Sequence, residues 1–426
     1  MNPNTHRRTI LKAGAAGAAI IGMPTIASAQ DVAKGKLKIG LIGCGGRGTG
    51  AAFQAMNASD DNVFWAVADV FQNRVDAAEQ KLKNTYGDRA QITPGRKFVG
   101  LDAYKKLIGE CDVVLIAGPP GFRPQHLRAA IEAGKHVFAE KPMAVDMAGV
   151  KSVLESAKLA KQKGVSIQHG FCWRFAPGVR AGMQQVHEGT IGDIRSVYGT
   201  YLASPPKVIM AANKRPAGMS DVEWQVMNWI NFRWLSGGPL LEQAIHTVDK
   251  VGWAMNDVAP IAAVATGGRL RDDDGGNIYD HYNIAYEYPN GVFAHVGQRQ
   301  FHKAHRETTD RIFGSKATFV GPGRPVIFGG AKWRYSAEKG QEQNMYQVCH
   351  NEFFAAIKEG KVINTGEYMA NSTALAILGR EAAYTGKRLT WDELWKSDQD
   401  LAPDDLKWDA SFPVDPIPRP GSYNLA

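Results

Sequence analysis

A glycine-rich turn constrains the fold of this chain more than any other feature of its sequence. In "KIGLIGCGGRGTGAAFQAM", Gly43, Gly45 and Gly48 have the spacing G-x-G-x-x-G. The apolar run 37–42 before them predicts a buried strand, and the residues after Gly48 predict a helix. The first glycine permits a tight turn, the second lets the backbone approach a phosphate, and the third lets helix and strand pack closely. The motif therefore predicts a pyrophosphate site at the helix N-terminus.

An acidic residue lies at the distance from these glycines that a dinucleotide site requires. A second apolar run, "VFWAVADV", reaches Asp69, 21 positions after Gly48. A carboxylate there accepts hydrogen bonds from ribose hydroxyls and repels a 2′-phosphate, so the pattern predicts NAD and disfavours NADP. Arg74 follows closely, either as a partner for a 2′-phosphate or as a solvated helix residue. We expect cofactor contacts from Gly43, Gly45, Gly46, Arg47, Gly48 and Asp69.

Strand-like and helix-like segments alternate through the next hundred residues. "CDVVLIAGPP", "KHVFAEKPMA" and "VSIQHGFCWRF" predict buried strands with helices between them. This alternation predicts an α/β fold with a doubly wound parallel sheet over residues 30–165. Ligands bind at the carboxyl ends of such strands, where Pro119, Pro120 and Lys141 lie. The chain has 426 residues, so the remaining stretch 166–426 predicts a second domain.

The first 29 residues have the order of an export signal. "RRTILK", with Arg7 and Arg8, is similar to the twin-arginine motif, and an Ala- and Gly-rich apolar run and the small residues of "ASA" at 27–29 follow it. The apolar run is too short and too mild for a stable membrane anchor. We therefore expect the twin-arginine export machinery to carry the folded protein to the periplasm or the extracellular space.

Charge and cysteine usage exclude several classes of function. The net charge is +8, but no run of five to eight residues is rich in Lys or Arg, so nucleic acid is not an expected partner. The four cysteines are scattered, without CxxC or any metal-ligand spacing, and the histidines have no repeated spacing. We expect no metal site.

Residues 238–253, "GPLLEQAIHTVDKVGW", predict a mostly apolar helix that carries an acid and an imidazole. The segment begins with a Gly-Pro pair, and proline suits the first turn of a helix. Glu242 and His246 lie one turn apart on the same surface. A solvated ion pair or a buried structural histidine explains the pair, and so does acid–base catalysis.

Taken in order, these segments resemble the Gfo/Idh/MocA family, which includes glucose-fructose oxidoreductase and inositol dehydrogenase. The resemblance is carried by "GLIGCGGRGTG", "DVVLIAGPP" with His126 nearby, "AEKPMAV", "GDI", "GGPLLEQAIHTVD", "YEYPNG" and "AILGREAAYTGKRLTWDEL". It implies an N-terminal Rossmann domain and a C-terminal α/β domain with a large open, mainly antiparallel sheet and C-terminal helices. Family members often use this sheet for oligomer contacts, so we expect a homo-oligomer.

The resemblance also implies roles for particular residues. Lys141 of the Glu-Lys-Pro motif and His246 would flank the substrate carbinol near the nicotinamide. The family pattern is Asp-x-x-x-His, and Glu242 replaces its aspartate here. This longer carboxylate would orient the histidine or bind a hydroxyl. Further cofactor contacts are expected from Pro119, Pro120, His126, Glu140 and Lys141.

The sequence offers several residues for carbohydrate binding. Indoles can pack on a sugar ring, and Trp224, Trp229 and Trp234 are closely spaced, although core packing explains them equally. Arg174 lies where the resemblance implies an arginine near the substrate. Two further residues have open interpretations: Trp173 is a substrate contact or a core residue, and Asp249 is a partner of the site or an ion-pair neighbour of Lys250.

Together these features predict an NAD(P)-dependent oxidoreductase that transfers a hydride between a nicotinamide and a secondary hydroxyl of a sugar, polyol or glycoside. His246 would act as the general base and Lys141 would stabilise the alkoxide. The alternative is a redox-neutral, NAD-dependent glycoside hydrolase, lyase or epimerase that forms a keto-sugar and keeps its cofactor tightly bound. A third hypothesis is a non-catalytic sugar-binding protein.

Overall fold

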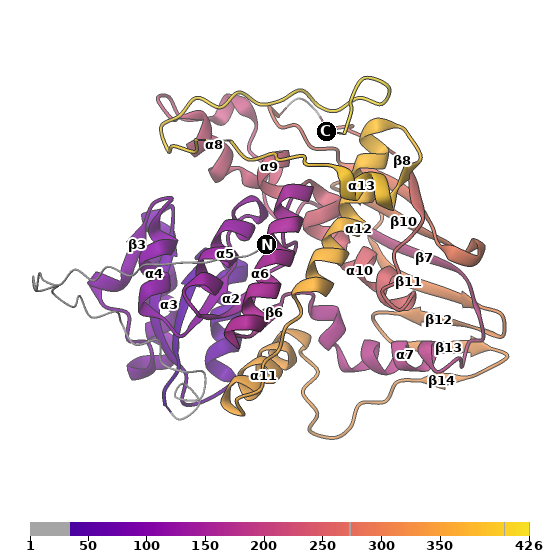
Figure 1. Cartoon of the computed structure of the whole chain (residues 1–426), viewed down its shortest axis with the longest axis horizontal. Helices are drawn as coiled ribbons and strands as arrows, with labels where there is room; N and C mark the ends of the chain where they lie inside the picture. The colour runs from indigo at the N-terminus through magenta and orange to yellow at the C-terminus, as the bar shows by residue number, and fades with distance from the viewer. Residues whose placement is uncertain (1–34, 272–273, 404, 426) are drawn as a thin grey trace, which may run out of the picture.

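The computed structural model of this protein contains two β-sheets, each with its own helices (Figure 1). The structure describes residues 35–271, 274–403 and 405–425. The export signal predicted at residues 1–29 lies outside the described residues. No helix of the described part is long and apolar enough to cross a membrane.

The N-terminal sheet is wholly parallel and has the strand order β3-β2-β1-β4-β5-β6. This is the order of a Rossmann fold, and it reverses between β1 and β4, where a crevice forms at the strand ends. The predicted α/β class and parallel sheet are confirmed. The strands are β1 (Lys38–Ile42), β2 (Val63–Asp69), β3 (Lys97–Val99), β4 (Val113–Ile116), β5 (His136–Ala139) and β6 (Ile167–His169).

Helices cover both faces of this sheet, whose central strands β1, β2, β4 and β5 are almost wholly buried, as a doubly wound sheet requires (Figure 1). The predicted domain boundary at residue 165 lies just before β6, which pairs with β5 in the first sheet. The helices are α2 (Gly46–Asn57), α3 (Gln72–Tyr86), α4 (Ala103–Glu110), α5 (Arg123–Glu132) and α6 (Met147–Lys163).

The second sheet has nine strands in the order β14-β13-β12-β11-β7-β10-β9-β8-β15. Only the β7–β10 pair is parallel among its described ladders, so the predicted mainly antiparallel sheet is confirmed. The strands are β7 (Ile194–Ala203), β8 (Ala262–Gly268), β9 (His281–Glu287), β10 (Phe293–Gln300), β11 (Glu307–Gly314), β12 (Ala317–Gly321), β13 (Val326–Gly329), β14 (Trp333–Arg334) and β15 (Leu389–Thr390).

Helices pack on one face of the second sheet and join it to the Rossmann domain (Figure 1). The central helix α12 is buried almost all round, between α6, α10 and β8. Helix α11 instead packs on α2 of the first domain. The helices are α7 (Pro177–His187), α8 (Asp221–Met227), α9 (Arg233–Ser236), α10 (Ile245–Ala254), α11 (Met345–Lys358), α12 (Gly366–Thr385) and α13 (Trp391–Lys396).

The other face of the second sheet is open and carries a row of apolar side chains. Strand register places Phe293 and Phe313 on either side of Ser196, and Thr318 beside both Phe313 and Phe328. The three phenylalanines are exposed. Large exposed apolar patches on soluble proteins usually mark interaction surfaces.

After α13 the chain continues to residue 425 without helix or strand in its described part. In Figure 1 this yellow segment passes over α8 and α9 toward the Rossmann domain and then returns.

Candidate active site

The glycine turn has the geometry that its spacing predicts. Gly43 has φ +93°, and a Cβ there would lie 2.4 Å from the backbone of Gly118. At Gly48 a Cβ would lie 1.9 Å from the Gly43 oxygen, so helix and strand pack as closely as the motif requires. No atom lies within 4 Å of the position that a Cβ would take at Gly45 or Gly46. That open backbone at the N-terminus of α2 fits a pyrophosphate.

Asp69 ends β2 with its carboxylate beside this turn. Its Oδ2 accepts a hydrogen bond from the Cys44 N–H at 2.8 Å, and its Oδ1 accepts one from the Phe71 N–H at 3.1 Å. Burial raises the pKa of this carboxyl, which the nearby Arg74 partly offsets. The Arg74 guanidinium is 4.0 Å away. The carboxylate is therefore fixed at the position from which it can bind ribose hydroxyls.

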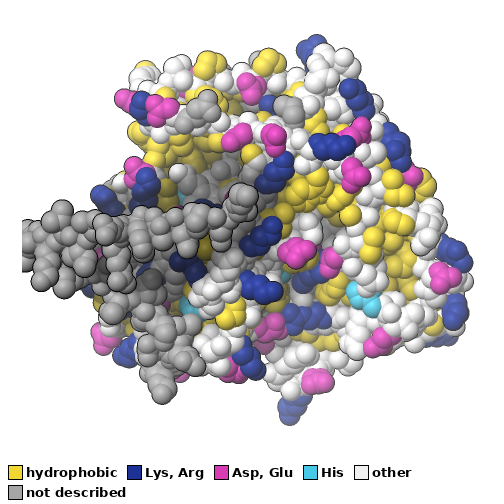
Figure 2. Space-filling view, viewed as in Figure 1, with side chains coloured by type: hydrophobic (Ala, Val, Ile, Leu, Met, Phe, Trp, Pro, Cys, Tyr) yellow, Lys and Arg dark blue, Asp and Glu magenta, His cyan; other side chains and the backbone are white. Residues whose placement is uncertain are grey.

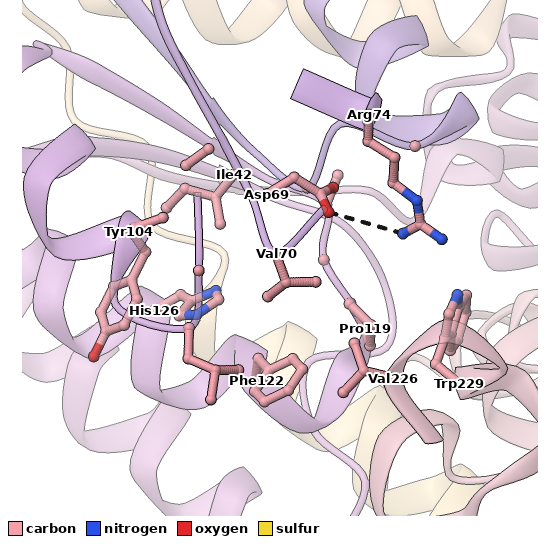
Figure 3. A pocket seen from close by; sticks show the side chains of 18 residues that line it. Ile42, Asp69, Val70, Arg74, Tyr104, Pro119, Phe122, His126, Val226 and Trp229 are labelled. Carbon is pink, nitrogen blue, oxygen red and sulfur yellow. Dashed lines mark ion pairs between the residues drawn. The ribbon is translucent and has the colours of Figure 1, made fainter. Parts of the chain in front are cut away.

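A pocket opens from Asp69 along the strand ends (Figure 3). Asp69 and Arg74 lie on one side of it, His126 and Tyr104 on the other, and Val226 and Trp229 of the second domain approach from below. Its lining includes two of the motif glycines and a carboxylate, and the rest is largely apolar, as an adenosine site requires. The lining residues include Ile42, Gly43, Gly45, Ala68, Asp69, Val70, Arg74, Gly100, Leu101, Tyr104, Gly118, Pro119, Phe122, His126, Val226 and Trp229.

His126 is neutral in this pocket. Burial lowers the pKa of its imidazole to about 3, and the Arg123 charge acts in the same direction. The ring lies 4.3 Å from the Tyr104 ring and 6.0 Å from that of Phe122. Pro119 lines the same pocket, whereas Pro120 begins a short helix, η3 (Pro120–Phe122), and is buried.

The predicted catalytic lysine contacts the predicted acid across the two domains. Lys141 follows β5, and its Nζ donates a hydrogen bond to the main-chain carbonyl of Glu242. The same nitrogen lies 3.7 Å from the Glu242 carboxylate. The two side chains are 12% and 18% exposed, so the pair is shielded but open to a ligand.

The helix that carries Glu242 begins with a π-helical turn, η7 (Leu240–Ala244), before α10. The sequence predicted a regular helix here. In a π turn each hydrogen bond spans one residue more than in an α-helix, and such turns are frequent at functional sites. Gly237 and Gly238, with φ +71° and +86°, turn the chain into it. The irregular backbone thus coincides with the residue whose carbonyl contacts Lys141.

His246 lies in the first turn of α10 and is 9% exposed. Burial lowers the pKa of its imidazole well below the ordinary value, and the positive charges of Lys141 and Lys250 lower it further. The imidazole is therefore neutral at pH 7 and able to accept a proton. Lys141 contacts Glu242, one helical turn before His246, and the shared catalytic role that the family resemblance implies for the three residues stays a prediction.

Arg47 and Glu140 link the glycine turn to the residue before Lys141. The Arg47 Nε lies 3.1 Å from the Glu140 carboxylate, which is almost fully buried. The guanidinium also lies over the Tyr346 ring, 4.6 Å from its centre. Both residues were predicted as cofactor contacts, and the structure gives them partners within the protein beside the cofactor turn.

Tyr201 belongs to this region, although no pattern in the sequence singled it out. Burial raises the pKa of its hydroxyl, and the charges of Glu242 and Arg306 act on it. It lines a cavity with Gln243 and Arg306. Strand alternation after "GDI" was the available signal, because it puts Tyr201 on the same face as Gly199, which faces α10.

The predicted substrate residues Arg174 and Asp249 contact each other. Two Arg174 nitrogens lie 3.2 and 3.3 Å from the Asp249 carboxylate. Ser372 donates a further bond to that carboxylate at 2.8 Å, and Tyr368 also donates to it. Asp257 binds the same guanidinium. Arg174 and Asp249 thus both have hydrogen-bond partners within the protein, and their contact with a substrate stays a prediction.

The tryptophans separate in space. Trp173 lies beneath the Lys250 ammonium, 4.9 Å from ring centre to nitrogen. Trp234 is buried, donates to Gln225 at 2.6 Å and packs against Phe122. Trp229 lines the adenosine pocket. The structure therefore places the indoles of Trp229 and Trp234 on the cofactor side of the molecule.

The charged side chains of the visible face are dispersed, and the described residues hold no cluster that suits a metal ion. Figure 2 shows acidic and basic side chains interspersed over the visible face. Within the described ranges, no group of three or more His, Cys, Asp or Glu side chains could hold a metal ion.

The fold and site define a two-domain dinucleotide-binding protein whose second domain brings an acid and an imidazole to the strand ends of the first. Two family models match it: "Oxidoreductase family, NAD-binding Rossmann fold" over residues 37–171, and "GFO/IDH/MocA C-terminal domain" over residues 179–320. The chain belongs to the Gfo/Idh/MocA oxidoreductase family.

Curated relatives are distant. Myo-inositol 2-dehydrogenase of Thermotoga maritima is 26% identical over 57% of this chain and 62% of its own length. 1,5-Anhydro-D-fructose reductase of Ensifer adhaerens is 27% identical over 66% of this chain and 81% of its own. The chain spans 62%, 37% and 61% of the first three curated relatives, less than two thirds of each.

Solved structures share the fold. Levoglucosan dehydrogenase in complex with NADH and levoglucosan superposes with a TM-score of 0.65 at 19% identity, over 83% of this chain and 99% of the other. Aldose-aldose oxidoreductase of Caulobacter crescentus gives a TM-score of 0.65 at 18% identity, with the same coverage. At these identities the likeness shows the fold alone.

Proposed function

We propose that this protein is an NAD-dependent oxidoreductase that transfers a hydride between the nicotinamide and a secondary hydroxyl of a sugar, polyol or glycoside. The contact between Lys141 and Glu242 carries the proposal, because it brings a cation and the His246 helix to the strand ends beside a dinucleotide pocket. Bound NAD would supply the hydride acceptor. Gly43, Gly45, Gly48 and Asp69 would hold it.

The protein groups have separate tasks in this proposal. Loss of a hydride from a carbinol requires loss of its hydroxyl proton, and the neutral His246 imidazole would accept that proton. The Lys141 ammonium would stabilise the negative oxygen that results. Glu242 would hold the ammonium in place through its carbonyl and its carboxylate. Tyr201 would bind a further hydroxyl of the substrate.

The names of relatives support a carbohydrate substrate. They include inositol dehydrogenases and an anhydrofructose reductase among the curated proteins, and a levoglucosan dehydrogenase with NADH among the solved structures. The names of these proteins give polyols or sugars as their substrates. A cyclic polyol or sugar is therefore the first substrate class to test here.

A substrate panel tests the proposal. Purified protein with NAD would be mixed with monosaccharides, polyols and glycosides, and the near-ultraviolet absorbance of reduced nicotinamide would be followed. We expect reduction with at least one compound, lost in His246→Gln and Lys141→Ala and kept in Lys105→Ala, which alters an exposed lysine paired with Asp102. No reduction with any compound, despite bound NAD, would contradict the proposal.

Export and assembly extend the proposal. The "RRTILK" motif and the cleavage pattern at 27–29 support export to the periplasm by the twin-arginine machinery. Replacement of Arg7 and Arg8 by lysine should then retain the protein in the cytoplasm. An unchanged periplasmic yield would reject that route. The open sheet face supports a homo-oligomer.

A further inference from the structure

A separate apolar cluster connects the C-terminal segment to the loops around the adenosine pocket. Its buried members are Phe122 of the first domain and, in the second, residues of α8 and α9 together with Phe232 between them. Two further groups of side chains pack against it. Val70, Phe71 and Leu101 come from the cofactor domain, and Leu401, Leu406, Trp408, Ala410 and Phe412 come from the C-terminal segment.

The C-terminal segment presents one apolar face to this cluster. Leu406, Trp408, Ala410 and Phe412 are partly buried, and the residues between them, 407, 409 and 411, are exposed. A turn closed by the Ala410 N–H and the Lys407 carbonyl lies within this stretch, and the four apolar side chains still point to the cluster. Residues 406–412 therefore pack against the cluster through these four side chains.

Trp408 packs against the loop that follows Asp69. Its ring lies 5.6 Å from that of Phe71 in an edge-to-face arrangement. The Phe71 N–H donates to the Asp69 carboxylate, and the Arg74 guanidinium lies 4.7 Å from the Phe71 ring. Trp408 thus packs on Phe71, which contacts both Asp69 and Arg74 at the ribose end of the pocket.

Phe412 reaches the pocket wall through two aromatic rings. It lies 5.5 Å from Trp234, and Trp234 lies 5.8 Å from Phe122, which lines the pocket. Polar contacts hold it there: the Phe412 N–H and the Ser411 hydroxyl donate to Asp221 at 2.9 and 3.0 Å. Gln225 donates to the Phe412 carbonyl at 2.6 Å.

Helix α8 and the turn after it lie between this segment and the pocket. Val226 and Trp229 line the pocket on the side facing Phe122 and Pro119 (Figure 3). The Ser220 hydroxyl, at the N-cap of α8, donates to the Trp408 carbonyl. The adenosine pocket is therefore closed by two layers: α8 with its following turn, and the C-terminal segment outside it.

We propose that α8, α9 and the C-terminal segment 397–425 form a clasp that keeps the dinucleotide bound through turnover. The proposal rests on the proposed NAD function. Release of the adenosine half would require the clasp to open and expose apolar side chains to water, which is unfavourable. An enzyme that keeps its cofactor must pass the hydride on, with a proton from water, to a carbonyl group that becomes an alcohol: either that of a second carbohydrate or that of the keto-sugar formed from the first.

The release rate of the nucleotide tests the clasp without any assay of activity. The full-length protein would be loaded with NADH, freed of excess by gel filtration, and mixed with a large excess of NAD while nucleotide fluorescence is followed. Trp408→Ala should release NADH at least about tenfold faster than wild type, since changes at such contacts act mainly on dissociation. Trp391→Ala is the matched control, because it removes an indole from an edge-to-face pair with Trp395 away from the pocket.

A second variant keeps the aromatic cluster intact. Asp221→Ala removes the carboxylate that holds Ser411 and Phe412, and it should also accelerate release. If wild type loses NADH within seconds, or if both clasp variants release it at the wild-type rate, the clasp is wrong. If wild type binds no nucleotide, the proposed function itself fails. Melting temperatures of the nucleotide-free variants, compared with that of Trp391→Ala, separate release from loss of folding.

Discussion

Lys141 donates a hydrogen bond to the main-chain carbonyl of Glu242, a residue 101 positions further along the chain and in the other domain. The carbonyl belongs to a π-helical turn, and the carboxylate of the same residue lies 3.7 Å from the lysine. One side chain of the cofactor domain is thus fixed by both the backbone and the side chain of the second domain. Substitutions at this contact therefore test chemistry more directly than they test folding.

Lys141→Ala should lower kcat by about 10²–10³-fold, because it removes the only cation that the account assigns to the developing alkoxide. NAD affinity should fall less than kcat does, since the glycine turn and the hydrogen-bonded Asp69 that would hold the dinucleotide are unchanged. Steady-state kinetics and nucleotide titration measure the two effects. An equal loss in the exposed-site control Lys105→Ala would point to a general effect of lost charge.

His246 gives a prediction about pH. Its folded-state pKa lies well below the ordinary value, so the imidazole stays neutral as pH falls through the range in which a free histidine gains its proton. The acidic limb of kcat/KM should therefore fall below pH 6.5, the ordinary histidine pKa. A pH–rate profile of wild type measures it. An inflection at the ordinary histidine pKa that disappears in His246→Gln would contradict the electrostatics.

Asp69→Ser should weaken NAD binding by about 10- to 100-fold, because hydrogen bonds to a charged acceptor contribute roughly 1.5–3 kcal/mol. The same change should admit NADP, since the carboxylate no longer repels a 2′-phosphate and Arg74 is nearby. Titration with both nucleotides checks the ratio. Unchanged discrimination would place the ribose elsewhere.

Tyr201→Phe should raise KM for the carbohydrate several-fold and leave kcat and NAD affinity close to wild type. The change removes one hydroxyl of a residue that lines a cavity with Gln243 and Arg306, and it keeps the ring on β7. Tyr335→Phe, which removes an exposed hydroxyl bonded to Gln341, is a control. If the substituted enzyme loses kcat instead, Tyr201 takes part in proton transfer.

Phe313→Glu should dissociate the expected oligomer, because it places a charge in the middle of the apolar row on the open sheet face. Light scattering after gel filtration gives the mass of wild type and variant. Val362→Glu, an equally exposed apolar site outside the sheet, should leave the mass unchanged. If wild type is a monomer, the exposed phenylalanines do not form an oligomer interface and this prediction is wrong.

Local patterns predicted the parts of this protein that depend on short stretches of sequence. The glycine turn and Asp69 are set by steric and hydrogen-bonding requirements within one strand–turn–helix unit, so their spacing alone identified them. The alternation of apolar strands with helices along the next hundred residues predicted the parallel sheet. A shared site for Lys141 and the helix of Glu242 and His246 was expected only through the family resemblance, and the direct contact of Lys141 with Glu242 was not predicted.

Contacts between distant segments could not be predicted from the sequence. Arg174 and Asp249 were predicted as substrate residues, but the structure pairs them with each other, and no local pattern contains that pairing. The C-terminal segment has no helical periodicity, and its alternation over 406–412 has meaning only when α8 is seen beside it. The π-helical turn likewise follows from tertiary packing.

The central claim is that a carbinol carbon of a carbohydrate gives its hydrogen to NAD at this site. The most direct measurement uses a substrate found in the panel and deuterated at that carbon, with mass analysis of the nucleotide recovered after a single turnover. The account predicts one deuterium on the nicotinamide of the wild-type product, and none with His246→Gln. Conversion of the carbohydrate with no deuterium in the nucleotide would contradict it.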